Sequence, residues 1–474
     1  MRPASLAAAA IAASLLGANA AAFAAAPAVD WKTQEAEILA RHRALIQIDS
    51  SSPPGNETKV DDYLKRVFEV EGIAVKTFAL QPARANLVAR LKGNGKKRPL
   101  LLMAHTDVVG VQREKWPVDP FAAVVKDGYI WGRGARDDKD KLAANLMVML
   151  LAKRMGTALD RDLIFLAESG EEADPAGVGI AYMVNNHFDE IDAEFALNEG
   201  GSATIQDGRV TRVNIQTTEK APRRFRLVAT GTSGHGSVPR LDNPLTHLSA
   251  AVEKIGNWVT PMRLNDTTRA YFERLAAISP PENAARYRAL LGPQPPAEIQ
   301  AYLAKNEPER YSMLRTSVVP TMMKAGVGPN VIPSVAEATF DVRALPDEDI
   351  PKLFASVEKL IADPQVKVEP ITTNLRPVAA ASKLDTEMYR ALVKVSEAMY
   401  PGVTVLPTMA TGATDMAQLR AKGVQSYGIG AASTESDTIN YGAHSDVERT
   451  SEQSLYRIVE FTWRAAMEVA AADK

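Results

Sequence analysis

The chain contains no cysteine. Disulfide bonds, thiolate zinc sites and a catalytic thiol are therefore excluded. A metal ion could be held only by nitrogen and oxygen ligands, which means imidazoles and carboxylates. Histidine is also scarce, with six in 474 residues, so a histidine that follows a predicted strand is informative.

An excess of charge of one sign is also missing, because 55 Lys and Arg face 57 Asp and Glu. A net charge of −2 gives no electrostatic reason to expect nucleic acid as a partner. The hydrophobic content of 46% and the charged content of 24% are ordinary for a soluble globular enzyme. A chain of 474 residues is too long for one compact core and indicates more than one domain.

Charge is locally absent at the N-terminus, where an Ala-rich, uncharged run extends from Arg2 to Asp30. Small residues recur at every second position from Ala18 to Ala24, as signal peptidase requires. We interpret residues 1–26 as a cleaved signal peptide and expect a periplasmic or secreted protein. A membrane anchor is the alternative, because the run is long enough to span. Alanine is only weakly apolar, so we expect no stable membrane insertion after cleavage.

Two continuous apolar runs, at 100–104 and 163–167, and a short, largely apolar run at 193–197 are typical of buried strands. A helix with an apolar face is predicted at 141–155, between the first two runs. Strands that alternate with helices predict an α/β sheet with helices on both faces. Sites in such sheets lie beyond the carboxyl ends of the strands. Polar side chains follow each run there: His105, Glu171 with Glu172, and Glu199.

The middle of the chain has a different pattern. Residues 224–229 and 335–342 alternate polar and apolar side chains, which favours a sheet with one wet face. A helix is predicted near 244–258, and a Pro- and charge-rich stretch follows at 261–309. After this region the α/β pattern resumes, with a strand expected near 366–372. The predicted divisions are a first catalytic part at 27–214, an inserted domain at 215–345 and a second catalytic part at 346–474.

Five side chains at strand ends or in glycine-containing loops could bind metal: His105, Asp137, Glu172, Glu199 and His444. Taken singly, each has a simpler interpretation, such as a helix cap for Asp137. Brought together, they would repel one another or stay poorly solvated unless a cation neutralised them. The combination implies metal-assisted hydrolysis. Asp107 could orient the imidazole of His105, and Glu171 would be free to move a proton.

These residues lie in motifs that resemble a known family. The motifs are His105-Thr106-Asp107, Gly132-Arg133-Gly134-Ala135-Arg136-Asp137-Asp138-Lys139, Glu171-Glu172, Asn198-Glu199-Gly200-Gly201 and Gly442-Ala443-His444. In order and context they resemble the dinuclear zinc metallopeptidase family of aminoacylase, acetylornithine deacetylase, succinyl-diaminopimelate desuccinylase, glutamate carboxypeptidase and carboxypeptidase S. The resemblance covers almost the whole chain after the predicted signal. It implies a zinc-exopeptidase-like mixed sheet flanked by helices, with an inserted α+β lid or dimerisation domain.

The resemblance also implies roles for the candidate residues. Asp137 would bridge two Zn²⁺ ions, for which Co²⁺ or Mn²⁺ are possible substitutes. His105 and Glu199 would complete one site, and Glu172 and His444 the other. Glu171 would be the general base and Asp107 would support His105. The family also has a cis peptide bond after the bridging Asp.

Further motifs match in the predicted lid and in the last third of the chain. Ser233-Gly234-His235-Gly236 resembles a lid motif whose histidine reaches an active site, and the inserted domain is expected to form a homodimer. The predicted substrate-binding residues are Asn330, Arg343, Gly412 and Thr414. Two departures from the family are Asp140, where glycine is usual, and the long stretch at 261–309.

The sequence therefore predicts an exported zinc-dependent amide hydrolase that releases an amino acid from a small peptide or an N-acyl amino acid. Carboxypeptidase and N-acyl amino acid amidohydrolase are both open, because the side-chain pocket cannot be read from the sequence. The alternative from another class is a catalytically silent metal- or peptide-binding protein of the same fold. We favour the enzyme because the general base and every metal ligand are present.

Overall fold

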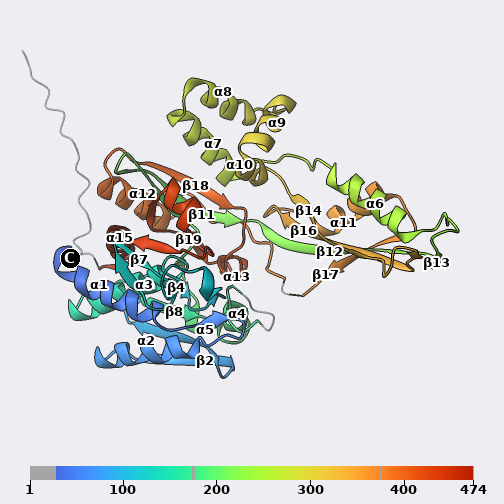
Figure 1. Ribbon diagram of the computed structural model, residues 1–474. Coiled ribbons are helices and arrows are strands. Elements are labelled where there is room, and N and C mark those ends of the chain that lie inside the picture. The colour runs from blue at the N-terminus through green and yellow to red at the C-terminus, as the bar shows by residue number, and fades with distance from the viewer. Residues whose placement is uncertain (1–27, 173–176, 374, 473–474) are drawn as a thin grey trace, which may run out of the picture.

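The computed structural model describes residues 28–172, 177–373 and 375–472, so the predicted signal peptide lies outside the described residues. The larger part of the molecule is a ten-stranded mixed sheet (Figure 1). Its strands, in spatial order, are β2 (Val75–Gln81), β3 (Arg84–Leu91), β8 (Leu163–Glu168), β4 (Leu100–His105), β9 (Phe195–Asn198), β19 (Gln425–Gly428), β11 (Arg209–Glu219), β10 (Ser202–Gln206) and β20 (Ala432–Thr434), with β18 (Thr404–Ala410) pairing with β11.

The central strands β8, β4, β9 and β19 run parallel to one another, so their carboxyl ends meet at one edge of the sheet. Their side chains are buried on both faces, as the continuous apolar runs predict. In β4, Leu100 and Leu102 belong to one hydrophobic core, whereas Leu101 and Met103 belong to another. The two-residue period of the strand therefore divides one apolar run between two cores.

Helices cover both faces of this sheet. The larger core lies under α1 (Trp31–Ile46), α2 (Thr58–Val70), α3 (Lys139–Arg154), α12 (Glu387–Met399) and α15 (Glu452–Ala470). The smaller core lies under α4 (Ile180–Asn186), α5 (Phe188–Ile191) and α13 (Met416–Ala421). The α/β fold class predicted from the sequence is confirmed. None of the described helices is both long and apolar enough to cross a membrane.

Short elements complete this part of the molecule. The small strands are β1 (Ser51–Ser52) with β5 (Val108–Val109), and β6 (Val124–Lys126) with β7 (Tyr129–Trp131) and β21 (Arg449–Ser451). The short helices are the 3-10 helix η1 (Arg113–Lys115) and α14 (Glu435–Tyr441).

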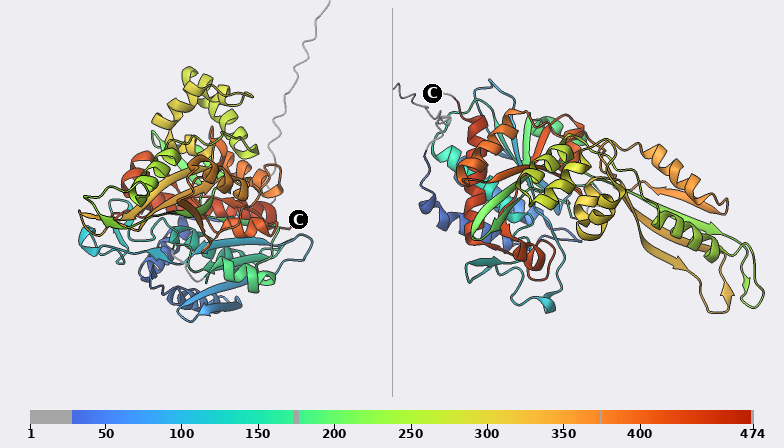
Figure 2. Two further views of the ribbon diagram at one scale, coloured as in Figure 1. Left: turned by 90° about the vertical axis from the view of Figure 1, so that its right-hand side faces the viewer. Right: turned by 90° about the horizontal axis from the view of Figure 1, so that it is seen from above.

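A second, four-stranded antiparallel sheet projects from the main body, and we call it with its two helices the arm (Figures 1 and 2). Its strands are β14 (Ser317–Ala325), β16 (Val335–Ala344), β12 (Ala221–Thr230) and β17 (Val366–Ile371), and its helices are α6 (Pro244–Gly256) and α11 (Ile350–Ile361). The helices pack on the apolar face, and every second residue of β16 is buried. The alternation read from the sequence therefore describes a sheet with one wet face.

The arm extends further along the chain than the expected boundary at residue 345. Strand β17, which we expected in the resumed α/β part, pairs with β12 over six residue pairs from Arg224–Ile371 to Ala229–Val366. The sequence at 366–372 predicts a strand but not which sheet it joins. That choice is made by pairing with β12, a contact between residues far apart in sequence.

The stretch at 261–309 mostly forms helices: α7 (Asp266–Ile278), α8 (Pro281–Leu290), α9 (Ala297–Asn306) and, just beyond, α10 (Pro308–Met313). We call these four helices the helical insertion. Their apolar residues share a core with Leu406 and Met409 of β18, so the insertion packs on the main body and not along the outer arm (Figure 1). Buried Lys220, between β11 and β12, donates to the carbonyl and hydroxyl oxygens of Ser312. The insertion thus contacts the point where the arm begins.

We expect Phe272→Ala to destabilise the helical insertion. Phe272 is fully buried and packs against the rings of Tyr271 and Tyr287. Truncating a buried phenylalanine typically costs about 3–5 kcal/mol. The denaturation midpoint should fall and proteolysis within 261–313 should accelerate. Ile278→Ala on the same helix, where Ile278 is 50% exposed, is the matched control and should change little. Equal effects from the two variants would contradict this packing.

Candidate metal centre and active site

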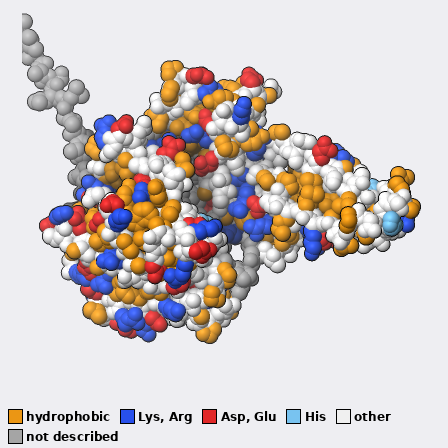
Figure 3. Space-filling view, viewed as in Figure 1, with side chains coloured by type: hydrophobic (Ala, Val, Ile, Leu, Met, Phe, Trp, Pro, Cys, Tyr) orange, Lys and Arg blue, Asp and Glu red, His pale blue; other side chains and the backbone are white. Residues whose placement is uncertain are grey.

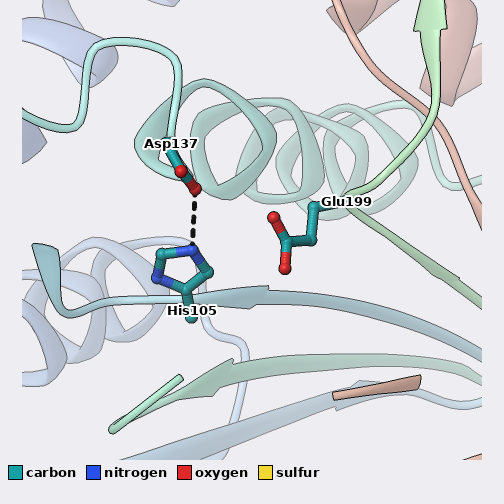
Figure 4. Close-up of side chains that lie close together, drawn as sticks. All are labelled: His105, Asp137 and Glu199. Atoms are coloured by element: carbon teal, nitrogen blue, oxygen red, sulfur yellow. Dashed lines mark hydrogen bonds and ion pairs between the residues drawn. The ribbon is translucent and has the colours of Figure 1, made fainter. Parts of the chain in front are cut away.

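The parallel strands bring the first group of predicted ligands together. His105 ends β4, and Glu199 directly follows β9. Asp137 comes from the loop before α3 and points at His105, and the Glu199 carboxylate lies to the side of this pair (Figure 4). His105 Nε2 lies 3.0 Å from Asp137 Oδ1. One potential ligand atom from each of the three residues lies within 4.8 Å of the others.

A second group shares Asp137 with the first. His444 Nε2 lies 3.0 Å from Glu172 Oε1 and 3.3 Å from Asp137 Oδ2. These three residues also offer ligand atoms within 4.8 Å of one another. The two oxygens of Asp137 thus face different groups, as expected of a carboxylate that bridges two ions. The peptide bond between Asp137 and Asp138 is cis, as the family resemblance implies.

Glu448 fixes the loop that carries Asp137. Its buried carboxylate accepts hydrogen bonds from the backbone N–H groups of Gly134, Arg136 and Asp137 and from the Arg133 guanidinium. Glu448 lies four residues after His444. One carboxylate therefore ties together the loops that supply Asp137 and His444. Glu448 is not among the residues predicted from the sequence, because its only local sign is an acid near a candidate ligand.

Asp107 contacts His105, as predicted, and also holds a neighbouring loop. The ring nitrogen His105 Nδ1 lies 3.0 Å from the backbone oxygen of Asp107 and 3.5 Å from its carboxylate. The carboxylate also accepts hydrogen bonds from three successive backbone N–H groups, those of Gly170, Glu171 and Glu172. Asp107 thus contacts the His105 ring through its backbone and its carboxylate, and its side chain also holds the loop of the predicted base and a ligand.

The electrostatics of the site fit a pair of cations. Burial, with the negative charges of Glu171 and Asp137, holds the pKa of Glu199 well above its usual value. Burial opposes protonation of His105, but hydrogen bonds with Asp107 and Asp137 outweigh it and raise its pKa well above the ordinary value. Hydrogen bonds with Asp137 and Glu172 raise the pKa of His444 to about 10. A pair of metal ions would supply the positive charge that these groups otherwise take up as protons.

Glu171 lies beside the ligands but in a different environment. Burial raises the pKa of its carboxyl to about 8, against the opposing charge of Arg376. Arg376 Nη2 donates to Glu171 Oε1 at 2.8 Å. A carboxyl group whose pKa lies near neutrality is suited to accept and return a proton. The sequence offered no motif for Arg376.

The predicted substrate residues are spread over two regions. Thr414 is buried in the loop after β18, and its N–H and hydroxyl both donate to Glu219 at the end of β11. Arg343, near the end of β16, pairs with Asp341 at 2.8 Å. Lys and Arg side chains gather around the hollow between the main body and the arm (Figure 3). A cavity of about 260 Å³ there is lined by Glu171, Glu172, Arg224 and Arg376 among others.

His235 and Asn330 lie far from this hollow. His235 is in β13 (Gly234–His235), which pairs with β15 (Val331–Ile332) at the outer tip of the arm (Figure 1). Gly236, which follows His235, donates its N–H to the Asn330 carbonyl, so His235 and Asn330 lie in neighbouring segments. Val335 lies beside this tip, and Arg343 lies near the base of the arm on the same strand, β16. The eight residues from one to the other span about 26 Å, which is how far the tip lies from the base. The structure therefore groups the predicted metal ligands, Asp107 and Glu171, but does not bring His235 to them within one chain.

Asp140 departs from the family pattern without disturbing the site. It lies in the first turn of α3, and its buried carboxylate pairs with Lys141 Nζ at 2.8 Å. The same ammonium group pairs with Asp138 and donates to the carbonyl of Arg136. The extra negative charge is thus balanced by a neighbouring cation.

Comparison with known proteins defines the class of this chain. Residues 101–468 match the model of Peptidase family M20/M25/M40, and the chain belongs to this family. The match confirms the family expected from the sequence, and the class of its members, metallopeptidases and amidohydrolases that act on amide bonds, agrees with the expected enzyme class.

Individual relatives and one solved structure show which members of this family the chain resembles. The chain is 30% identical to a probable carboxypeptidase S-like 2 of Dictyostelium discoideum, over 70% of this chain and 64% of that protein. It is 27% identical to human N-fatty-acyl-amino acid synthase/hydrolase PM20D1, over 79% of this chain and 76% of that one. Thus it spans just under two thirds of the first relative. The solved M20 family metallo-carboxypeptidase Sso-CP2 of Sulfolobus solfataricus shares the fold, with a TM-score of 0.68 at 20% identity, over 90% of this chain and 98% of that one.

We expect the purified protein to bind about two divalent ions per chain. Because Asp137 belongs to both ligand groups and Glu199 to one, Asp137→Asn should weaken binding at both positions, whereas Glu199→Gln should lose about one ion. Metal analysis of folded, chelator-free protein measures this difference. Two tightly bound ions in Asp137→Asn would refute the shared-ligand arrangement.

Proposed function

We propose that this protein is a zinc-dependent hydrolase that releases an amino acid from a small peptide or an N-acyl amino acid. The observation that carries the proposal is the pair of ligand groups that share Asp137, with Glu171 beside them. Imidazole and carboxylate ligands without cysteine suit Zn²⁺, and also Co²⁺ or Mn²⁺. When bound, the ions would supply Lewis-acid activation of water and of the amide carbonyl.

The residues of the chain divide the remaining work. Glu171 accepts the proton of the attacking water and returns it to the leaving amine nitrogen. Asp107 keeps Glu171 and Glu172 in place through their backbone N–H groups. Glu448 does the same for the loop of Asp137. The site is thus preorganised by hydrogen bonds from backbone groups, which do not have to move during the reaction.

The substrate class follows from charge and from the relatives. The names of the two relatives point to peptides with a free carboxyl end and to N-acyl amino acids, and both kinds of substrate end in a carboxylate. We propose that Arg343 holds this carboxylate with its planar, two-pronged donor. Its position near the base of the arm supports this role. Asn330, Gly412 and Thr414 stay predicted substrate contacts. Export to the periplasm or medium is supported by the composition of residues 1–26.

We further propose that two chains form a dimer through the arm and that His235 completes the partner's active site. The edge strand β14 exposes Val319, Met322 and Met323 to 50%, 68% and 57%. An exposed apolar edge strand is suited to pairing with a second copy. In this arrangement His235 would stabilise the oxyanion that forms on the substrate.

Replacing Glu171 with Gln should remove most turnover while fold and metal content remain. General acid–base groups contribute about 10²–10⁴-fold, so kcat on a dipeptide or N-acyl amino acid should fall by that factor. Asp189→Asn, in α5 and outside the site, is a control that should keep full activity. Near-normal kcat in Glu171→Gln would move the base elsewhere. A wild-type protein that binds metal but cleaves neither substrate class would favour the silent binding protein instead.

Mixing two inactive variants tests the shared site. His235→Ala alone should lose about 10²–10³-fold, the usual cost of one oxyanion donor. In a mixed dimer with Glu171→Gln, one of the two sites would contain both intact residues. Random pairing of equal amounts should restore about a quarter of wild-type activity, because half of the dimers are mixed. His247→Gln, from the same arm, is the control and should be active unmixed. If mixing restores nothing, His235 does not serve a partner's site.

A further inference from the structure

We propose that Arg376 is a positioning residue that holds the side chain of Glu171 in its working orientation. This inference rests on the proposed function, in which Glu171 is the base. Arg376 Nη2 donates to Glu171 Oε1 at 2.8 Å and to the backbone oxygen of Glu171 at 3.2 Å. One nitrogen thus contacts both ends of the same residue. This closed arrangement restricts rotation of the Glu171 side chain.

Arg376 is itself held from two sides. Its Nη1 lies 3.0 Å from Asp415 Oδ1, and the Asp415 side chain is buried. Its backbone oxygen accepts a hydrogen bond from Arg223 Nη1 at 2.8 Å. Arg223 belongs to β12 of the arm, whereas Asp415 belongs to the main body. The guanidinium thus lies between two carboxylates of the main body, those of Glu171 and Asp415, while the arm holds the Arg376 backbone.

Arg376 lies in a segment that connects the arm to the main body. This segment follows β17 and returns the chain from the arm. The connection between β11 and β12 is fastened by Glu219 to Thr414, next to Asp415. These two connections of the arm thus meet the loop at 414–415. Glu171, the proposed base, is therefore oriented by a residue of the segment that joins the arm to the main body.

A direct role for Arg376 in binding the substrate carboxylate is the competing interpretation. Both guanidinium ends already face carboxylates of the protein, which argues against it. The two roles predict different kinetics. A substrate-binding arginine would mainly change KM, whereas a residue that positions the base would mainly change kcat.

The first test is Arg376→Gln, assayed on a dipeptide or N-acyl amino acid that the wild type cleaves. We expect kcat to fall about 10- to 100-fold, the effect of misplacing a reacting group, with KM and metal content little changed. Arg226→Gln is the matched control. Arg226 carries the same charge, but it lies on β12 of the arm and pairs with Glu337 and Glu369, away from the cavity. Equal losses of kcat in both variants, or a rise in KM alone for Arg376→Gln, would overturn the proposal.

The second test is a double-mutant cycle with Glu171→Gln. If Arg376 acts through Glu171, adding Arg376→Gln to Glu171→Gln should cause no further loss of kcat. Independent, multiplying losses would overturn the proposal. The proposed function fails in a distinguishable way, because Glu171→Gln alone would then keep its activity.

Arg376→Lys covers the case in which Arg376→Gln does not fold. It keeps the positive charge but cannot contact Glu171 and Asp415 with two separate prongs. We expect a folded protein with kcat between those of wild type and Arg376→Gln. Full wild-type kcat in the lysine variant would contradict a role for the two-pronged geometry.

Discussion

Three carboxylates, those of Asp137, Glu172 and Glu199, lie close together with two imidazoles at the carboxyl edge of a buried sheet. The repulsion among these carboxylates is the constraint on which the site depends. Negative charges at this spacing repel one another unless a cation compensates them. Burial and the neighbouring acids raise the pKa of Glu199, and hydrogen bonds with Asp107 and Asp137 raise that of His105. Two divalent cations would relieve the repulsion, which links the fold directly to metal chemistry.

Other buried carboxylates make this arrangement possible. Asp107 and Glu448 do not belong to either ligand group, yet each accepts three backbone N–H groups from a loop that carries site residues. Charge-assisted hydrogen bonds of this kind are stronger than neutral ones. The loops at 134–137 and 170–172 are therefore held by fixed negative charges, and their side chains stay free to bind metal or move a proton.

The arm carries two predicted site residues, Arg343 and His235, at its opposite ends. Near its base it places Arg343 close to the main body, and at its tip it carries His235, far from the ligands of the same chain. The helical insertion packs against β18 and contacts Lys220 where the arm begins. Together with Glu219 and Arg376, it fastens the arm to the body. A stable arm angle would fix where its tip can meet a second chain.

The sequence by itself determined the local elements and the chemistry. Adjacent residues suffice to predict the buried strand at 100–104 and the alternating strand at 335–342. Short motifs suffice to predict the candidate ligands His105, Asp137, Glu172, Glu199 and His444. Only the tertiary structure decided that strand β17 joins the arm, that the Asp107 carboxylate binds backbone N–H groups, and that Glu448 and Arg376 support the site. Each of these depends on contacts between segments far apart in the chain, and a periodic pattern or motif describes only neighbours along it.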